Sequence, residues 1–275
     1  MRDIAGKTVL ITGGSAGVGL AAAQRFLQLG AGVAISGRNA QSLAEAARTL
    51  GSPARVMTLV WDAADVQLAD EMFSAVEARF GKLHVLVNNA GCNHRGELEG
   101  LTAVQVQQVI DTNFRAPLLL THAALPYLRR AGEGAIVNVA SLAGHVPLRH
   151  EAIYSATKFG LRGFSLSLAQ DLEDSEISVS VVSPGPIDTG FIMDDIEDVP
   201  DIVLSQPMSS AAEVAEQIVA CVRDGRTERC LPVLSGVLAD IAYLFPRPAR
   251  WLQPMLQRRG QRARALIRAR RSRVQ

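Results

Sequence analysis

The chain has 275 residues, 48% of them hydrophobic and 20% charged, which is typical of a soluble globular protein with a buried core. Three widely spaced cysteines exclude a disulfide framework and indicate a reducing compartment. The sequence contains no run of 18 or more apolar residues, so we expect no membrane-spanning helix. Residues 247–275 contain ten arginines and no acidic residue, so the rest of the chain, with 18 basic and 27 acidic residues, has a net charge of −9. The first β-rich run begins at residue 8, which leaves no room for a cleaved signal peptide, and we expect a cytoplasmic protein.

In chain order, short β-rich runs alternate with helix-like segments. The predicted strands lie at 8–12, 32–36, 55–60, 84–89, 134–141 and 178–183. The predicted helices lie at 20–29, 40–50, 66–80, 103–130 and 153–173. This alternation predicts one α/β domain over residues 1–246, a doubly wound parallel sheet of about seven strands with helices on both faces.

The pattern changes after the sixth predicted strand. Residues 184–210 mix turn residues with acidic and apolar ones, and we name them the substrate loop because long loops in such folds tend to cover a site. Residues 209–225 predict a helix with a serine start and a glycine stop. One apolar stripe follows in 233–246, which suits core packing, a subunit interface, an apolar pocket or a membrane-facing patch. The stripe consists of Leu234, Val237, Leu238, Ile241, Leu244 and Phe245.

Residues 247–275 predict a basic helical C-terminal tail. Apolar residues such as Trp251 and Met255 lie among its arginines. A basic amphipathic helix suits peripheral contact with an anionic membrane, although a solvated end is the commoner outcome for this composition. The positive charge of this tail would also permit binding to nucleic acid, but we do not expect that partner.

A glycine-rich turn joins the first predicted strand to the first helix. It contains Gly13, Gly17 and Gly19 in the sequence "TGGSAGVG". Glycine permits the tight turn and lets the backbone approach a pyrophosphate, and the helix N-terminus presents N–H groups to the phosphates. A glycine-rich turn alone can have a purely structural role. Its place between a strand and a helix at the start of the alternating fold favours dinucleotide binding.

The end of the second predicted strand bears on the choice of cofactor. An acidic residue there would bind the adenosine ribose hydroxyls of NAD(H), and this chain has Ser36, Gly37 and Arg38 instead. The guanidinium of Arg38 suits a 2′-phosphate, although a solvated loop arginine is the plain alternative. We therefore expect NADP(H) rather than NAD(H).

Five motifs occur in order along the chain. They are the glycine turn from Thr12 to Gly19, N-N-A-G at Asn88–Gly91, Asn113 in "IDTNF", Ser141 thirteen residues before Tyr154 of Y-x-x-x-K, and Pro184–Gly185 after the next strand. Together they resemble the short-chain dehydrogenase/reductase family, over about residues 7–190 and more weakly to about 231. The resemblance implies a single-domain Rossmann-type fold and an NADP(H)-dependent oxidoreductase.

The resemblance also implies the catalytic roles. Tyr154 exchanges a proton with the substrate oxygen, Ser141 hydrogen-bonds the same oxygen, Lys158 binds the nicotinamide ribose, and Asn113 positions water and the lysine in a proton relay. A free tyrosine has a pKa of about 10, and we expect the Lys158 ammonium one turn away to lower it. The expected cofactor contacts are Gly13, Ser15, Gly17, Val18, Gly19, Arg38, Asp62, Asn89, Gly91, Tyr154, Lys158, Pro184, Gly185, Ile187 and Thr189. Of these, Asp62 can equally be a plain turn carboxylate.

Other candidate residues receive structural roles. We expect no metal, because the histidines lack ligand partners at useful spacing. His145 and His150 are predicted to lie on a loop surface, and Cys92 to fill a small buried apolar space.

The apolar residues of the C-terminal half favour an apolar ketone or alcohol as substrate, of the lipid, acyl or steroid-like kind. Family resemblance implies a homodimer or homotetramer, paired through 103–130 and 153–173. A 3-oxoacyl-thioester reductase is an alternative, with Arg129, Arg130 and Arg162 docking an acidic carrier. A non-catalytic NADP-sensing or membrane-associated binding protein is an alternative of another class.

Overall fold

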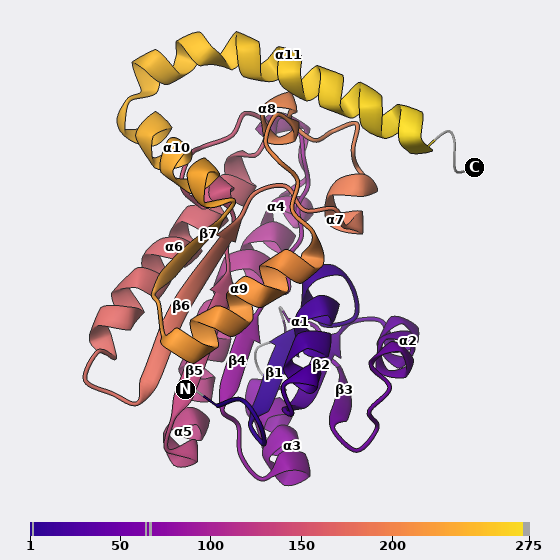
Figure 1. Cartoon of the computed structure of the whole chain (residues 1–275), viewed down its shortest axis with the longest axis vertical. Coiled ribbons are helices and arrows are strands. Elements are labelled where there is room, and N and C mark those ends of the chain that lie inside the picture. Colours follow the sequence, from indigo (N-terminus) through magenta and orange to yellow (C-terminus); the bar gives the residue numbers. More distant parts are fainter. Residues whose placement is uncertain (2, 64, 66–67, 272–275) are drawn as a thin grey trace.

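A parallel seven-stranded sheet organises the protein (Figure 1). The computed structural model describes residues 1, 3–63, 65 and 68–271. The strand order is β3-β2-β1-β4-β5-β6-β7, and every neighbouring pair is parallel, which confirms the predicted doubly wound sheet. The strands are β1 (Thr8–Thr12), β2 (Gly32–Gly37), β3 (Val56–Val60), β4 (Val85–Asn88), β5 (Gly134–Val139), β6 (Ile177–Pro184) and β7 (Glu228–Leu231).

Helices cover both faces of the sheet. On one face lie α1 (Gly17–Gln28), α2 (Ala40–Leu50) and α9 (Ala211–Asp224), and on the other lie α3 (Ala69–Phe80), α5 (Ala116–Ala131) and α6 (Ala152–Asp171). Consecutive side chains of a strand point to opposite faces, so Val9 and Ile11 join the core under α1 and α9. Leu10 between them joins the core under α3 and α5. Burial on both faces explains the continuous apolar strands of the sequence.

The helix predicted at 103–130 contains a change of helical geometry. It consists of α4 (Ala103–Ile110), a π-helical turn (Asp111–Arg115) and α5. Such a turn inserts a residue into the helix and often occurs at functional sites. Elsewhere, the predicted helix at 66–80 begins at Ala69 in the structure, and residues 66–67 lie outside the described residues.

The substrate loop and the last two helices form a separate layer at one end of the sheet (Figure 1). The substrate loop contains two short helices, α7 (Gly190–Met193) and α8 (Asp201–Leu204). Two longer helices follow β7, namely α10 (Val233–Leu244) and α11 (Pro246–Arg271), and α11 lies across α8. Within the part of the chain that the structure describes, no helix has the length and apolar character needed to cross a membrane.

Candidate active site

A cavity of about 450 Å³ opens at the carboxyl ends of β1, β4, β5 and β6. The strand order reverses between β1 and β4, and ligands of parallel α/β sheets bind at such a switch point. Twelve of the expected site residues line this cavity. They are Gly13, Gly17, Val18, Asn89, Gly91, Ser141, Tyr154, Lys158, Pro184, Gly185, Ile187 and Thr189.

The glycine turn forms one end of the cavity. A Cβ on Gly13, at a φ of +65°, would lie 2.9 Å from the Cα of Ala90, and a Cβ on Gly19 would lie 2.2 Å from the carbonyl oxygen of Gly13. Helix α1 begins at Gly17 with no side-chain cap and no acid in its first turn. The N–H groups and the dipole of this turn therefore fit a phosphate anion.

Four other expected residues lie around this turn without lining the cavity. Gly19 packs behind it, and the Ser15 hydroxyl lies near Gly37 at the end of β2. Arg38 follows β2 directly and is exposed. Asp62 follows β3 on the same edge of the sheet and is also exposed. The adenosine end of a dinucleotide that bound at the turn would lie toward these two strand ends.

Ser141, Tyr154 and Lys158 meet in the middle of the cavity. Ser141 follows β5 and caps a short 3-10 turn at Leu142–Gly144, with its Oγ accepting from the N–H of Ala143 at 3.1 Å. Its hydroxyl also hydrogen-bonds the Tyr154 side chain. Lys158 lies one turn further along α6, with its Nζ 5.6 Å from the centre of the Tyr154 ring. A donor pair and a cation therefore face one region of the cavity.

The electrostatics of this trio differ from the expectation. Burial raises the pKa of Tyr154 to about 12, opposed by the hydrogen bond from Ser141. Burial also lowers the pKa of Lys158 to about 8. The Tyr154 pKa was expected to fall, but it is raised, because desolvation of the buried phenol is the largest influence on it. Tyr154 stays protonated at neutral pH, as a proton donor requires.

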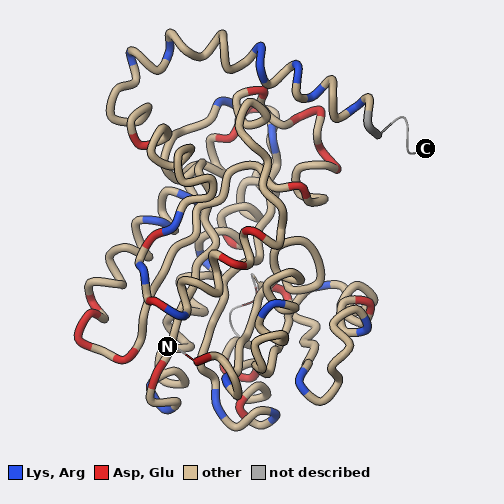
Figure 2. The backbone as a smooth tube through the Cα atoms, in the orientation of Figure 1, with Lys and Arg blue, Asp and Glu red and all other residues tan. Residues whose placement is uncertain are grey.

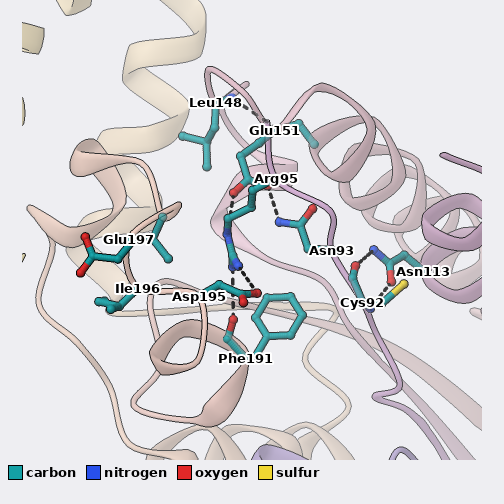
Figure 3. Close-up of polar contacts among 12 residues, drawn as sticks. Cys92, Asn93, Arg95, Asn113, Leu148, Glu151, Phe191, Asp195, Ile196 and Glu197 are labelled. Carbon is teal, nitrogen blue, oxygen red and sulfur yellow. Dashed lines mark hydrogen bonds and ion pairs between the residues drawn. The ribbon is translucent and has the colours of Figure 1, made fainter. Parts of the chain in front are cut away.

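Asn113 lies outside the cavity, in the π-helical turn, and is completely buried. Its Oδ1 accepts from the N–H of Cys92 and its Nδ2 donates to the carbonyl of Cys92, both at 2.8 Å (Figure 3). A Cβ on Gly91 would lie 3.4 Å from Asn113 Oδ1 and 3.8 Å from Lys158 Nζ. Asn113 thus fixes the chain after β4 against the lysine. Its part in a proton relay stays a prediction.

A second polar cluster lies beside the trio, and the sequence analysis missed it. Figure 3 shows Arg95 between Glu151, Asp195 and Phe191. Its Nε donates to Glu151 at 3.2 Å, Nη1 to Asp195 at 3.1 Å, and Nη2 to the carbonyl of Phe191 at 3.2 Å. Asn93 also donates to Glu151. These residues are far apart in the sequence, so no local sequence pattern predicts that they form a cluster.

Arg95 ties the segment after β4 to α7 and to the N-terminus of the helix that carries Tyr154. The side chains of Arg95 and Glu151 are 5% and 4% exposed, so this ion pair is buried. Burial raises the pKa of Glu151, against the contacts with Asn93 and Arg95. The Phe191 ring lies 5.5 Å from the Arg95 guanidinium and 6.1 Å from the Tyr154 ring. This arrangement holds an aromatic wall next to Tyr154.

The prediction that His145 lies on a loop surface is wrong. Its side chain is fully buried, with Nδ1 2.8 Å from Asp240 and Nε2 3.5 Å from Glu228. The hydrogen bond between Nδ1 and Asp240, together with the contacts of Nε2 with Glu228 and Cys230, fastens the turn after Ser141 to α10 and β7. His150 is half-buried and has a φ of 62°. Cys92 is half-buried, and burial raises the pKa of its thiol.

Among the described residues, no group of three or more His, Cys, Asp or Glu side chains is placed to hold a metal ion. The residues described above bring together a glycine turn, a Ser–Tyr–Lys trio and an aromatic wall.

Comparison with known proteins agrees with this arrangement. A family model described as short chain dehydrogenase matches residues 7–199. An uncharacterized oxidoreductase of Staphylococcus epidermidis is 35% identical over 69% of this chain and 81% of its own. The ketoacyl reductase HetN of Nostoc sp. is 30% identical over 83% and 79% of the two chains, and sulfoacetaldehyde reductase 2 of Chromohalobacter salexigens is 35% identical over 70% and 76%. The chain belongs to the short-chain dehydrogenase/reductase family, whose oxidoreductases use NAD(H) or NADP(H).

Proposed function

We propose that the protein is an NADP(H)-dependent oxidoreductase that interconverts a ketone and a secondary alcohol on an apolar substrate, with Tyr154 as the acid and base. One observation carries the proposal: a single cavity joins the glycine turn, the hydrogen-bonded Ser141 and Tyr154, and an apolar wall. We propose residues 1–246 as the catalytic domain, since all three parts come from them, and residues 247–275 as a basic C-terminal tail added to it.

The residues of the trio divide the work of reduction. The bound nicotinamide supplies the hydride. Tyr154, protonated at neutral pH, donates its proton to the carbonyl oxygen, and Ser141 hydrogen-bonds the same oxygen as its charge develops. Lys158 holds a positive charge below pH 8 beside the tyrosine and binds the nicotinamide ribose. Oxidation runs the same proton transfer in reverse.

The glycine turn would hold the pyrophosphate, and Asn89, Gly91 and the segment from Pro184 to Thr189 would hold the nicotinamide side. Arg38 supports NADP(H) over NAD(H), because it is an exposed cation at the end of β2 where no acid follows the strand. Asp62 at the end of β3 is the proposed contact for adenine. Asn113 is proposed to support Lys158 from behind Gly91.

The substrate end of the cavity favours an apolar molecule. Its side chains are mostly aliphatic or aromatic, and the charges of Arg95 and Glu151 offset each other there. The apolar lining comprises Val146, Leu148, Phe191, Ile192, Val199 and Val203. A lipid, acyl or steroid-like ketone suits these walls.

A 3-oxoacyl-thioester reductase is the second candidate, and the name of the relative HetN, a ketoacyl reductase, favours it. The proposed carrier contact is weaker than the sequence indicated. Arg130 is paired with Glu77, and Arg162 makes two hydrogen bonds to Glu228. Of the three arginines, only Arg129 is left for a carrier contact in the described structure. Activity on carrier-linked against free 3-oxoacyl substrates separates the two candidates.

The proposed assembly is a homodimer or homotetramer in the cytoplasm. The pairing is proposed through the helices at 103–130 and 153–173. Within the first of these segments, Val104, Ile110 and Leu119 expose apolar side chains, which supports its part in the contact. The measurement is the molar mass in solution.

The test of the proposed reaction is consumption of NADPH with a panel of apolar ketones, beside NADH. We expect turnover with NADPH and a higher KM for NADH. Tight NADPH binding without turnover on any ketone would favour a non-catalytic, NADP-sensing protein instead. Absence of NADPH binding would contradict the assignment of the glycine turn and Arg38.

A further inference from the structure

Helix α10 exposes an apolar surface that the proposed reaction does not use. Eight large apolar side chains on and just after this helix are 48–70% exposed. They are Val233, Leu234, Val237, Leu238, Ile241, Tyr243, Leu244 and Phe245. The sequence left core packing open for the stripe at 233–246, and the structure excludes it, because these side chains reach solvent. An exposed apolar surface of this extent marks an interaction site.

Helix α11 has an inner face that is fastened to the protein body. Gly260, Ala263, Arg264 and Ile267 recur at helical spacing on this face. A Cβ on Gly260 would lie 1.8 Å from a backbone oxygen of α8, and Ala263 and Ile267 pack on the buried cluster of the substrate loop. Arg264 donates to the Asp201 carboxylate at 2.7 Å and to three carbonyls of the loop. These are the carbonyls of Ile196 at 2.8 Å, Val199 at 2.6 Å and Glu197. These contacts fix which face of α11 points outward.

The outer face of α11 combines apolar and cationic side chains. Trp251, Met255, Arg258, Arg262 and Leu266 form one stripe, and all five are exposed, Trp251 by 84%. Helix α11 contains no acidic residue, and Figure 2 shows basic positions along its length without an acidic one among them. We name these five residues the docking stripe.

We propose that α10 and the docking stripe of α11 bind an anionic membrane surface. The apolar side chains would enter the boundary between headgroups and acyl chains, while Arg258 and Arg262 contact lipid phosphates. Tryptophan is enriched at this depth of a bilayer because its ring is apolar with one polar edge. Helix α11 follows α10 and contacts it, and both lie at one end of the molecule (Figure 1).

The mixture of residues distinguishes a membrane from other occupants. A second copy of the chain stacked stripe to stripe would bring arginines of both copies together, which is unfavourable. A nucleic acid would contact the arginines and leave the exposed aliphatic residues of α10 in water. Anionic lipid satisfies both kinds of side chain at once.

The position of the stripe links the membrane to the cavity. The inner face of α11 packs on the cluster of Ile192, Ile196, Val199 and Leu204, and Ile192 and Val199 also line the cavity. An apolar substrate dissolved in the bilayer would therefore have a short path to the site. This last point rests on the proposed function, whereas membrane binding itself does not.

The test is co-sedimentation of the full chain with vesicles of phosphatidylcholine alone or with phosphatidylglycerol added. We expect binding to the anionic vesicles that weakens as salt rises. Each arginine near such a surface contributes about a fivefold increase in affinity, so R258Q/R262Q lowers binding by roughly 25-fold. The matched control R48Q/R223Q removes two exposed arginines of α2 and α9 and retains the binding.

Tryptophan fluorescence gives a second measurement. Trp61 is buried, whereas Trp251 is exposed, so a blue shift on adding anionic vesicles that is absent in W251F reports insertion of the stripe. Circular dichroism checks that each variant is folded. Equal binding of R258Q/R262Q and the control, or no binding to anionic vesicles, would overturn the proposal. A dimer that loses its contact on W251S, or equal affinity for duplex DNA, would assign the surface to those partners instead.

Discussion

The Lys158 Nζ donates a hydrogen bond to the carbonyl oxygen of Val139 at 3.0 Å, and this bond holds the ammonium against the end of β5. The side chain is only 4% exposed, and no carboxylate contacts it in the described structure. A buried ammonium without a counter-ion destabilises the folded state. Its presence beside Tyr154 is therefore best explained by catalysis rather than by folding.

Lys158→Met should make the protein more stable at pH 7 while abolishing turnover. Burial lowers the lysine pKa from 10.5 to about 8, which corresponds to about 3 kcal/mol, and the lost hydrogen bond offsets about 1 kcal/mol. The folded state binds fewer protons than the unfolded state between pH 8 and 10.5, so the cost is complete below pH 8 and fades above it. The gain of about 2 kcal/mol should accordingly shrink from pH 7 to pH 10 in denaturant unfolding. Lys82→Met, an exposed control, should show no gain at either pH.

Arg95→Met should destabilise the protein by about 3 kcal/mol, because it leaves the Glu151 carboxylate buried without its cation. Arg95→Met/Glu151→Leu should recover part of that loss, since the second substitution removes the stranded charge. Denaturant unfolding measures both. The control is Arg115→Met, which breaks an exposed pair with Asp111 and should change stability by less than about 1 kcal/mol. Equal losses for Arg95→Met and Arg115→Met would show that the Arg95 contacts contribute little.

The same arginine should affect substrate binding. Arg95 holds α7 through Asp195 and the backbone of Phe191, whose ring lies near Tyr154. Asp195→Ala removes one contact at the exposed end and leaves the buried pair of Arg95 and Glu151 intact. We expect a several-fold rise in KM for an apolar ketone with kcat changed less, measured by steady-state kinetics. A fall in kcat at constant KM would argue against a role for this contact in closing the substrate wall.

Arg38→Leu should weaken NADPH binding and leave NADH binding nearly unchanged. A charge-assisted hydrogen bond to a phosphate contributes about 1.5–3 kcal/mol, which predicts a loss of roughly 10- to 100-fold in NADPH affinity. Quenching of intrinsic fluorescence measures both dissociation constants. Arg48→Leu removes an exposed arginine elsewhere and should leave them unchanged. If Arg38→Leu weakened the binding of NADPH and of NADH by the same factor, Arg38 would not be the residue that recognises the 2′-phosphate.

Much of the fold could be predicted because its signals are local. Each of the six apolar runs is a strand, and the central ones are buried on both faces, which requires a continuous apolar sequence. The seventh strand, Glu228–Leu231, was not predicted, because it is a half-buried edge strand with charged residues. The π-helical turn around Asn113 was not predicted, because its sequence keeps the apolar pattern of an ordinary helix.

The candidate site divides in the same way. Tyr154 and Lys158 are one helical turn apart, so their proximity follows from the sequence. The contact between Arg95 and Glu151 spans 56 positions, and the burial of His145 depends on Asp240 and Glu228 far along the chain. The sign of the Tyr154 pKa shift also escaped, because it depends on how much protein surrounds the ring, which spacing alone does not give.

The most direct test of the central claim compares wild type with Tyr154→Phe for both NADPH binding and single-turnover reduction of the best apolar ketone. If Tyr154 is the proton donor, the variant should still bind NADPH but reduce the ketone at least about 100-fold more slowly. Reduction at a rate near that of wild type, with binding intact, would contradict the assignment of Tyr154 as the acid and base.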